Sequence, residues 1–310
     1  MSGKLKVILR WCKMLMGKSV FHMRQCEGKY YEKNEIRGYY SDLRHKVAGA
    51  SLIDENGVPY NQTNRGNTVY FAITIFQYGL GSYDLFLETG NKDYLNRFFN
   101  AVNWAFENQL EDGSWNAFDW STPNAPFSSM AQSEGASLLC RAYKEINKPE
   151  YLDSAIRAVE FMLKPVEEGG TAFHKDDTIT LEEASDELTI LNGMMFSIWG
   201  LYDVCLLTKD MGLKESLNKT VKTLELLIDD YDRGYWSNYD LGENIASPFY
   251  HDLHIEQLKV MYNLFGNSKF NLTCEKWKKY QNSIIRSKIA FIVKAMQKLR
   301  KIDNEIALVK

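Results

Sequence analysis

Apolar residues recur at helical spacing in four long segments of this chain, 69–88, 128–146, 188–208 and 249–265. A turn and then a shorter, amphipathic pattern follow each of these segments. In the first such pattern Phe98, Val102 and Ala105 are three or four residues apart, which places them on one face of a helix. The pattern therefore predicts a chain in which long apolar helices alternate with amphipathic ones.

The turns repeat as well. Three amphipathic patterns begin after a turn and an aromatic residue, at 90–94, 147–151 and 266–270. Three end in a glycine–aromatic segment, at 113–115, 169–173 and 234–236. Repeated helix pairs are typical of curved helical arrays. We predict a mainly α fold, an incomplete (α/α) toroid or barrel of helix pairs, with the glycine–aromatic loops gathered at one end.

Residues 25–66 differ from the rest of the chain. Several tyrosines, the apolar segment 47–53 and the turn at 54–57 indicate a small N-terminal β-hairpin region that packs on the ring. The predicted organisation is a basic amphipathic segment at 1–24, a β-hairpin extension at 25–66, the (α/α) toroid domain that carries the site at 67–280, and a basic helix and tail at 281–310.

Charge is distributed unevenly. The net charge is −3, yet residues 1–24 hold six Lys or Arg and no acidic residue, and residues 266–310 hold eleven basic residues against three acidic ones. Basic ends favour contact with an anionic surface or polymer, and a pair of solvated helical faces is the alternative. We expect peripheral membrane contact through the basic termini and no nucleic-acid partner, and a homodimer is permitted.

Three features of the sequence predict the cellular compartment: the N-terminal charges, the length of the apolar runs and the cysteines. Lys4, Lys6, Arg10 and Lys13 break up the apolar residues near the N-terminus, so no secretory signal is expected. The sequence contains no run of about 18 apolar residues, so no membrane span is predicted. Five scattered cysteines without metal-type spacing indicate free thiols in a reducing compartment. We therefore expect a cytoplasmic protein, at most peripheral to the membrane.

Candidate chemistry is densest where a short irregular loop, 242–248, joins Tyr239 to Tyr250, His251 and His254. A buried phenol needs a hydrogen-bond partner, so tyrosines are poor core-fillers. Two phenols that face each other in a pocket could remove and return protons on opposite faces of one carbon. Aromatic residues that simply cap the core are the alternative interpretation.

Several blocks, in order along the chain, resemble the D-glucuronyl C5-epimerases, which act on heparosan and heparan sulfate precursors. They include Gly-Val-Pro at 57–59, Leu-Asn-Gly at 191–193, Tyr-Asp-Leu at 239–241 and Tyr-His-x-x-His at 250–254. The resemblance implies two catalytic tyrosines, matched by Tyr239 and Tyr250.

The resemblance also implies a catalytic glutamate from a Glu-Glu-Tyr segment. Glu183 matches it, with Glu182 as the alternative, and Ala184 stands where the family has tyrosine. The implied reaction inverts C5 of D-glucuronyl residues to give L-iduronyl residues in a heparosan-like acidic polysaccharide. It proceeds by proton abstraction and reprotonation from opposite faces.

Removal of the C5 proton builds negative charge beside the sugar carboxylate, so the site must present positive or hydrogen-bonding groups. The residues expected to contact the substrate are His251, His254, Asn192, Arg44, Tyr78 and Glu182. The chemistry requires no cofactor and no metal ligands at the site, although Asp229, Asp230 and Asp232 permit a structural Ca²⁺ ion.

Three other functions fit parts of the same pattern. A uronate polysaccharide lyase would begin with the same proton removal and then eliminate at C4. A glycoside hydrolase needs two carboxylates across the scissile bond, and its candidates are Asp119, Glu134, Glu183 and Asp240. A non-catalytic glycan-binding protein would need none of these reactive groups.

Overall fold

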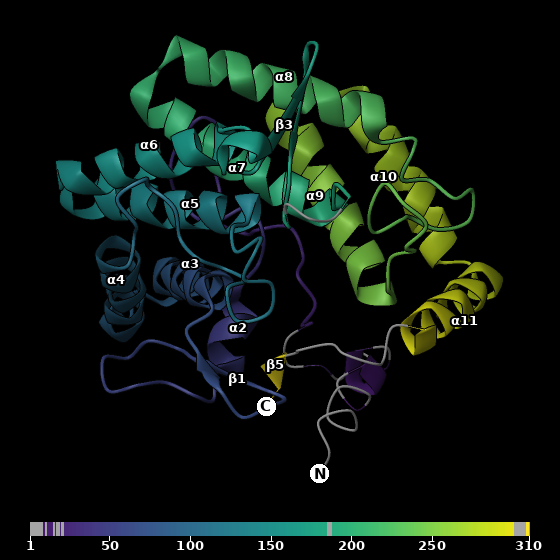
Figure 1. Cartoon of the computed structure of the whole chain (residues 1–310), viewed down its shortest axis with the longest axis horizontal. Helices are drawn as coiled ribbons and strands as arrows, with labels where there is room; N and C mark the ends of the chain where they lie inside the picture. Colours follow the sequence, from purple (N-terminus) through teal and green to yellow (C-terminus); the bar gives the residue numbers. More distant parts are fainter. Residues whose placement is uncertain are drawn as a thin grey trace.

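The computed structural model describes residues 9, 11–14, 16, 19, 22–184, 188–300 and 308–309. Four helices form an inner layer: α3 (Ala72–Thr89), α5 (Ser129–Ile146), α7 (Leu191–Thr208) and α9 (Pro248–Phe265). Four others lie outside them (Figure 1): α4 (Lys92–Glu107), α6 (Pro149–Leu163), α8 (Met211–Leu227) and α10 (Ser268–Gln281). The ring is open on the side where the chain ends lie, which confirms the predicted incomplete (α/α) toroid.

The two layers differ in burial as the sequence pattern predicts. Every residue at 129–142 of α5 and at 191–204 of α7 is buried. The outer helix α4 buries one face only, through Phe98, Ala101, Val102 and Ala105. A helix that is apolar on all sides belongs in the interior, and an amphipathic one at the surface. The inner helices therefore pack against one another and are covered by the outer layer.

Glycine–asparagine turns reverse the chain within two of the helix pairs. Gly90 and Gly266 end α3 and α9 in the left-handed conformation, with φ of 70° and 71°. Asn91 and Asn267 then cap α4 and α10, each accepting a hydrogen bond from a backbone N–H of the following turn. Glycine adopts positive φ without steric cost, and asparagine is a preferred N-cap. Each turn thus stops one helix and starts the next.

The N-terminal extension differs from the predicted hairpin. Residues 47–49 belong to α2 (Arg44–Gly49), whose Val47 is buried, and α2 packs on α3. The predicted turn at 54–57 is present, because the Gly57 N–H donates to the Asp54 carbonyl at 3.0 Å. The prediction of a strand from residue 47 was wrong, since burial against a helix overrides the β-propensity of a single valine.

Two small sheets are present in the described part of the chain. β1 (Asn61–Thr63) pairs antiparallel with β2 (Thr68–Val69) on one side and with β5 (Leu308–Val309) on the other. The register places Thr63 opposite Leu308. β5 thus brings the C-terminal end of the chain to the open side of the ring.

The second sheet is a hairpin of β3 (Ala172–Lys175) and β4 (Thr178–Leu181), preceded by the 3₁₀ helix η1 (Val166–Glu168). The glycine–aromatic segment at 169–173 predicts a loop here. The hairpin turns at Asp176, whose φ is 51°, and β4 leads directly into Glu182 and Glu183. Its function is therefore to deliver these glutamates to the start of α7.

At the C-terminal end, α11 (Ile284–Arg300) confirms the predicted basic helix. Most of the predicted amphipathic segment at 1–24 lies outside the described residues. No helix in the described part of the chain is long and apolar enough to cross a bilayer.

A buried ion pair joins the extension to the ring. Arg141 of α5 contacts Asp203 of α7 at 2.6 Å, and both side chains are excluded from solvent. Tyr40 donates its phenol to Asp203 at 2.6 Å, and Arg141 also donates to the carbonyl of Gly38 at 2.9 Å. Buried charges are tolerated only when their hydrogen bonds are satisfied. The segment that carries Gly38 and Tyr40 is thereby fixed to two inner helices.

Candidate active site

A pocket of about 220 Å³ opens at the end of the ring where the inner helices begin. The first turn of each inner helix reaches it, through Thr74 of α3, Met130 of α5, Asn192 of α7 and Tyr250 of α9. A helix N-terminus carries a partial positive charge. Four of them converging on one pocket favour an anionic ligand there.

The two predicted tyrosines contact each other at the wall of this pocket that Tyr250 forms. The ring centroids of Tyr239 and Tyr250 are 4.7 Å apart, with the rings tilted by 59°. Tyr250 lines the pocket. The backbone carbonyl of Tyr239 accepts a hydrogen bond from the N–H of Leu191 at 3.0 Å, which ties the tyrosine loop to the start of α7. The prediction that the two phenols lie together is confirmed.

The same contact changes the expected geometry. Two rings whose centroids are 4.7 Å apart leave no room for a sugar ring between them. The predicted arrangement, with the two phenols facing each other across one carbon, is therefore not present.

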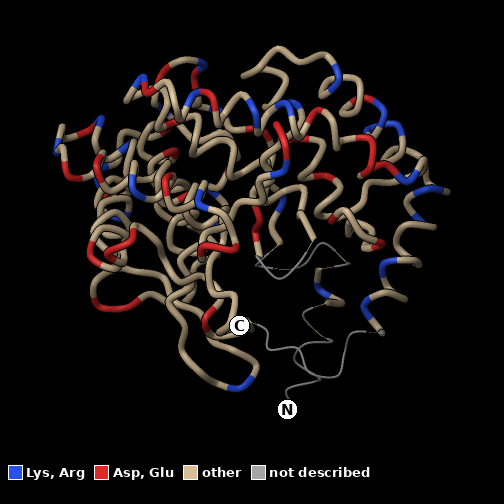
Figure 2. Tube along the Cα trace, turned by 45° about the horizontal axis from the view of Figure 1, so that its top comes forward, with Lys and Arg blue, Asp and Glu red and all other residues tan. Residues whose placement is uncertain are grey.

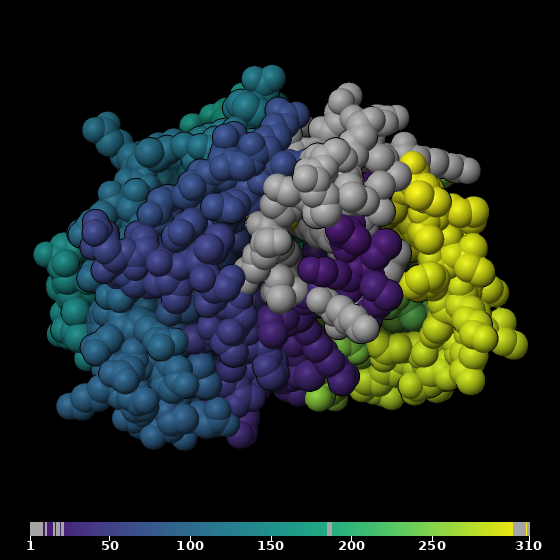
Figure 3. Space-filling model, turned by 90° about the horizontal axis from the view of Figure 1, so that it is seen from below, coloured from purple at the N-terminus to yellow at the C-terminus, as the bar shows by residue number. Residues whose placement is uncertain are grey.

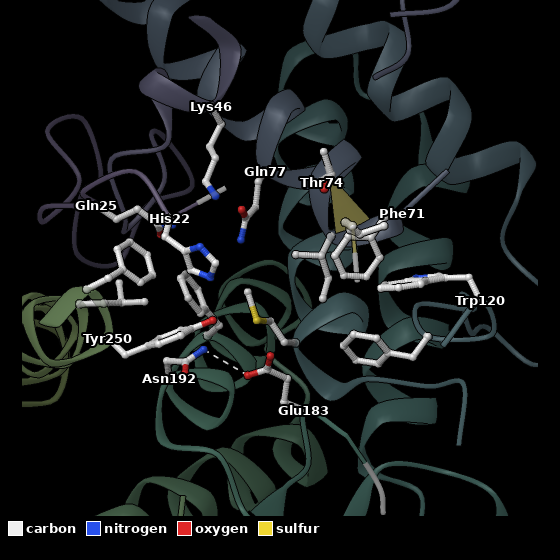
Figure 4. Close-up of a pocket in the computed structure, with 17 residues that line it drawn as sticks. His22, Gln25, Lys46, Phe71, Thr74, Gln77, Trp120, Glu183, Asn192 and Tyr250 are labelled. Carbon is white, nitrogen blue, oxygen red and sulfur yellow. Dashed lines mark hydrogen bonds between the residues drawn. The ribbon is translucent and has the colours of Figure 1, made fainter. Parts of the chain in front are cut away.

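Glu183 is the acidic residue that lines the pocket. Asn192 donates its amide to Glu183 Oε2 at 3.1 Å (Figure 4). At Gly193, an added Cβ would lie 2.5 Å from both Cβ and Oε2 of Glu183. The Leu-Asn-Gly block thus positions Glu183, because Asn192 orients its carboxylate and Gly193 leaves space for it.

Glu182 points away from this pocket. It is buried and accepts hydrogen bonds from Thr180 Oγ1 at 2.6 Å and Thr189 Oγ1 at 2.9 Å. Successive residues in an extended segment face opposite sides, so only one of the two glutamates can face the ligand. The prediction that Glu182 contacts substrate is not supported, and Glu183 takes that place.

The opposite wall of the pocket carries Lys46 from α2 and Gln77 from α3 (Figure 4). Gln77 Nε2 donates to Oε1 of Glu134 at 3.0 Å. Glu134 is fully buried, and this burial raises the pKa of its carboxyl to about 8. Glu134 is therefore protonated at neutral pH and fixes the amide of Gln77 without adding a negative charge to the site.

Aromatic rings form a further side of the pocket. Phe71 lies 5.6 Å from Phe118 and 5.8 Å from Trp120, measured between ring centroids. His22, from the N-terminal part of the chain, contacts Tyr250 edge-on at 5.8 Å. Pockets of this kind combine apolar surface with a few polar groups that fix orientation.

His251 and His254 are not at the pocket. Both Nδ1 atoms lie within hydrogen-bond distance of Ser237 Oγ, at 2.8 and 3.0 Å, and His251 stacks on Trp236 at 3.7 Å. Burial lowers the pKa of His251 to about 3 and that of His254 well below its usual value. Both rings are neutral core residues at neutral pH, so the prediction that they bind the sugar carboxylate was wrong.

Arg44 and Tyr78 are also placed elsewhere. Arg44 pairs with Asp42 at 2.7 Å and with Glu88 at 2.6 Å, beside a separate surface depression. Tyr78 is buried and lines a smaller neighbouring cavity of about 50 Å³. Arg44 is held by two carboxylates, and Tyr78 follows Gln77 on the helix and so faces a different direction.

The residues predicted for a metal or for glycoside hydrolysis do not converge. Among the described residues, no three His, Cys, Asp or Glu side chains come together as a metal site. Asp232 instead pairs with Lys276 at 2.8 Å, and Asp229 with Lys269 at 2.8 Å. Within the described lining of the pocket, Glu183 is the one carboxylate, so the second carboxylate of a hydrolase is not present there.

Sequence reasoning missed Lys46, Gln77 and His22. Lys46 lies in the predicted β-hairpin extension, directly before the apolar segment 47–53, and Gln77 directly precedes Tyr78, which was predicted to contact the substrate. No local motif marks any of the three, because Lys46 and Gln77 reach the pocket through the packing of α2 on α3, and His22 reaches it through its contacts with Phe249 and Tyr250 of α9.

Comparisons with known proteins agree with this arrangement. The sequence profile described as D-glucuronyl C5-epimerase C-terminus matches residues 100–279. A D-glucuronyl C5-epimerase of Caenorhabditis elegans is 28% identical over 209 residues, which are 58% of this chain and 34% of that protein. This chain therefore spans about a third of the length of that relative.

Among solved structures, the Lin0763 protein from Listeria innocua aligns with a TM-score of 0.52 at 13% identity, over 74% of this chain and 73% of that one. This likeness concerns the fold alone. The matched sequence profile covers more than half of the chain and includes Glu183, Asn192, Tyr239 and Tyr250. The chain belongs to the D-glucuronyl C5-epimerase family.

Proposed function

We propose that this protein is a polysaccharide C5-epimerase that converts D-glucuronyl to L-iduronyl residues in a heparosan-like polymer. One observation carries the proposal: Tyr250 and Glu183 line the same pocket, at the point where four helix N-termini and Lys46 favour an anion. Membership of the family supports it, as does the relative that bears this enzyme's name.

In the proposed reaction the sugar carboxylate lies near Lys46 and the helix N-termini, which stabilise the charge that develops on its oxygens. One group, Tyr250 or Glu183, takes the C5 proton. The electron pair of the broken C–H bond moves into the carboxylate to form an enolate. The other group then returns a proton to the opposite face of C5. No further reactant is needed, and the reverse reaction uses the same groups.

Tyr239 has a different part in this scheme. Its ring contacts Tyr250 rather than the pocket surface. We assign it the positioning of the Tyr250 phenol and the exchange of protons with it. Phe118 and Trp120 provide the apolar surface on which a neighbouring sugar unit would rest.

The test is to incubate the protein with heparosan in deuterated water and follow C5 by NMR. The expected result is deuterium at C5, with L-iduronyl signals and an unchanged chain length. Shortened chains with an unsaturated, ultraviolet-absorbing end would show a lyase instead. The absence of exchange in any uronate polymer would contradict the enzyme proposal, leaving glycan binding as the function to test.

A further inference from the structure

Helix α11 presents its apolar side chains to solvent. The exposed fractions range from 40% for Phe291 to 73% for Ile284 and Ile285. The exposed apolar residues are Ile284, Ile285, Ile289, Phe291, Ile292, Met296 and Leu299. Within this set, 285, 289, 292, 296 and 299 follow alternating spacings of four and three, so they form one continuous stripe.

The inward face of the same helix combines polar groups with Ala290, which is fully buried in the core, and Val293, which packs against it. Lys294 is buried and donates its ammonium group to the carbonyl of Ile245 at 2.7 Å. Gln297 accepts from the N–H of Ile245 at 3.1 Å. Thus α11 is attached to the ring through two polar side chains and a small apolar contact, and it leaves its large apolar side chains uncovered. A contiguous apolar patch on a soluble scaffold usually marks a contact surface.

The positive charge of α11 indicates which kind of partner covers its apolar stripe. The sequence of α11 holds five Lys or Arg and no acidic residue, and Figure 2 shows the positive charges repeating along it. A second copy of α11 would bring Lys288 and Arg286 close to like charges. An acidic polysaccharide would match the charge but would leave the isoleucines in water. An anionic lipid surface satisfies both features, because Lys and Arg can extend their charges to headgroups around a submerged apolar stripe.

The described N-terminal residues lie on the same side of the molecule (Figure 3). Lys298 of α11 lies 5.0 Å from the ring of Trp11. Trp11 and Met14 are buried, whereas Leu9 and Met16 are 41% and 59% exposed. The described N-terminal residues therefore contact α11 at one face and add the exposed apolar side chains of Leu9 and Met16 to it.

We propose that α11, together with the adjoining N-terminal residues, docks the protein flat on an anionic lipid bilayer. The stripe enters the boundary between headgroups and acyl chains, and Arg286, Lys288 and Lys298 contact lipid phosphates. This inference does not depend on the proposed reaction, and it can be tested without measuring activity.

The experiment is cosedimentation of the full chain with vesicles of phosphatidylcholine and phosphatidylglycerol, compared with vesicles of phosphatidylcholine alone. The test variant is Ile285→Glu combined with Ile292→Glu. Its matched control is Met211→Glu combined with Leu226→Glu, two exposed apolar residues of the distant helix α8, at 73% and 54%. All four side chains are exposed, so each variant should keep the helical circular dichroism of the parent.

We expect binding only to the vesicles that contain phosphatidylglycerol. The α11 variant should lower the partition coefficient by about a hundredfold, since two large apolar groups no longer leave water, and the α8 variant should leave it unchanged. Lys288→Glu should reduce binding by about tenfold. Three results would overturn the proposal: equal binding to neutral vesicles, unaltered binding of the α11 variant, or a dimer in sedimentation velocity that this variant dissociates, which would make a second copy the occupant.

Discussion

Tyr250 and His251 are neighbours in the sequence but differ in environment. Tyr250 lines the pocket, whereas His251 stacks on Trp236 and has a pKa lowered by burial. Successive residues of an α-helix point about 100° apart. The motif thus located the cluster correctly, but only packing decides which of its members faces the ligand.

The phenol of Tyr250 can be tested against another tyrosine of the same helix. Tyr250→Phe should lower deuterium exchange at C5 by about a hundredfold to ten-thousandfold, because it removes a proton-transfer group while keeping the ring. Tyr262→Phe is the control, since Tyr262 lies near the other end of α9 and is 38% exposed. Equal exchange rates in the two variants would exclude Tyr250 from the chemistry.

The raised pKa of Glu134 predicts how the free energy of unfolding changes with pH. Its pKa is about 8 in the fold against an ordinary value of 4.5, because burial disfavours the charged form. Between these values the folded protein holds a proton that the unfolded chain releases. The contribution of this group to stability is therefore greatest below pH 4.5 and falls as the pH rises toward 8, by at most about 1.4 kcal/mol per pH unit.

The measurement is urea unfolding near both ends of that pH range. Glu134→Gln should remove this part of the pH dependence, since the amide stays neutral and can still accept from Gln77. Glu107→Gln, at an exposed position at the end of α4, should leave it in place. The same pH profile for the parent and Glu134→Gln would mean that the buried carboxyl does not carry this proton.

Whole elements were predictable where one period dominated the sequence. The inner and outer helices followed from apolar spacing and from the Gly-Asn turns at 90–91 and 266–267. The short helix α2 and the β3–β4 hairpin were not predicted. Each of these elements is too short to show a clear apolar period, and their conformation depends on the α3 and α8 surfaces that they contact. Because α2 supplies Lys46, this error also hid one wall of the candidate site.

The Arg141–Asp203 pair is expected to hold elements together rather than to act on substrate. Arg141→Met leaves Asp203 buried without its cation, so it should lower the free energy of unfolding by about 3–5 kcal/mol. Lys222→Met breaks an exposed pair with Glu225 and should change it by less than about 1 kcal/mol. Chemical denaturation of both variants checks this, and equal stabilities would contradict the assigned role.

For the molecule as a whole, the pocket is built from both halves of the chain. The family-matched residues 100–279 supply Tyr250, Glu183 and Asn192. Lys46 and Gln77, on the facing wall, precede residue 100. The ring must therefore close through α2 and α3 before the two walls face each other, and sequence similarity over one half reveals only half of the site.

A fragment of residues 100–310 tests this dependence. It lacks Gly38 and Tyr40, the partners of the buried Arg141–Asp203 pair, and it exposes the face of α5 that packs on α3. We expect it to lose cooperative thermal unfolding and C5 exchange together.

Lys46→Met in the full chain separates the loss of the fold from the loss of C5 exchange. The parent fold should remain by circular dichroism, and KM for the polymer should rise by about tenfold or more as a charge-assisted contact to the carboxylate disappears. A fragment that exchanges deuterium at the full rate, or a Lys46→Met variant with the parent KM, would show that one wall is sufficient. The fragment that starts at residue 100 keeps the N-terminus of α5 but loses that of α3. We therefore expect neither of these two results.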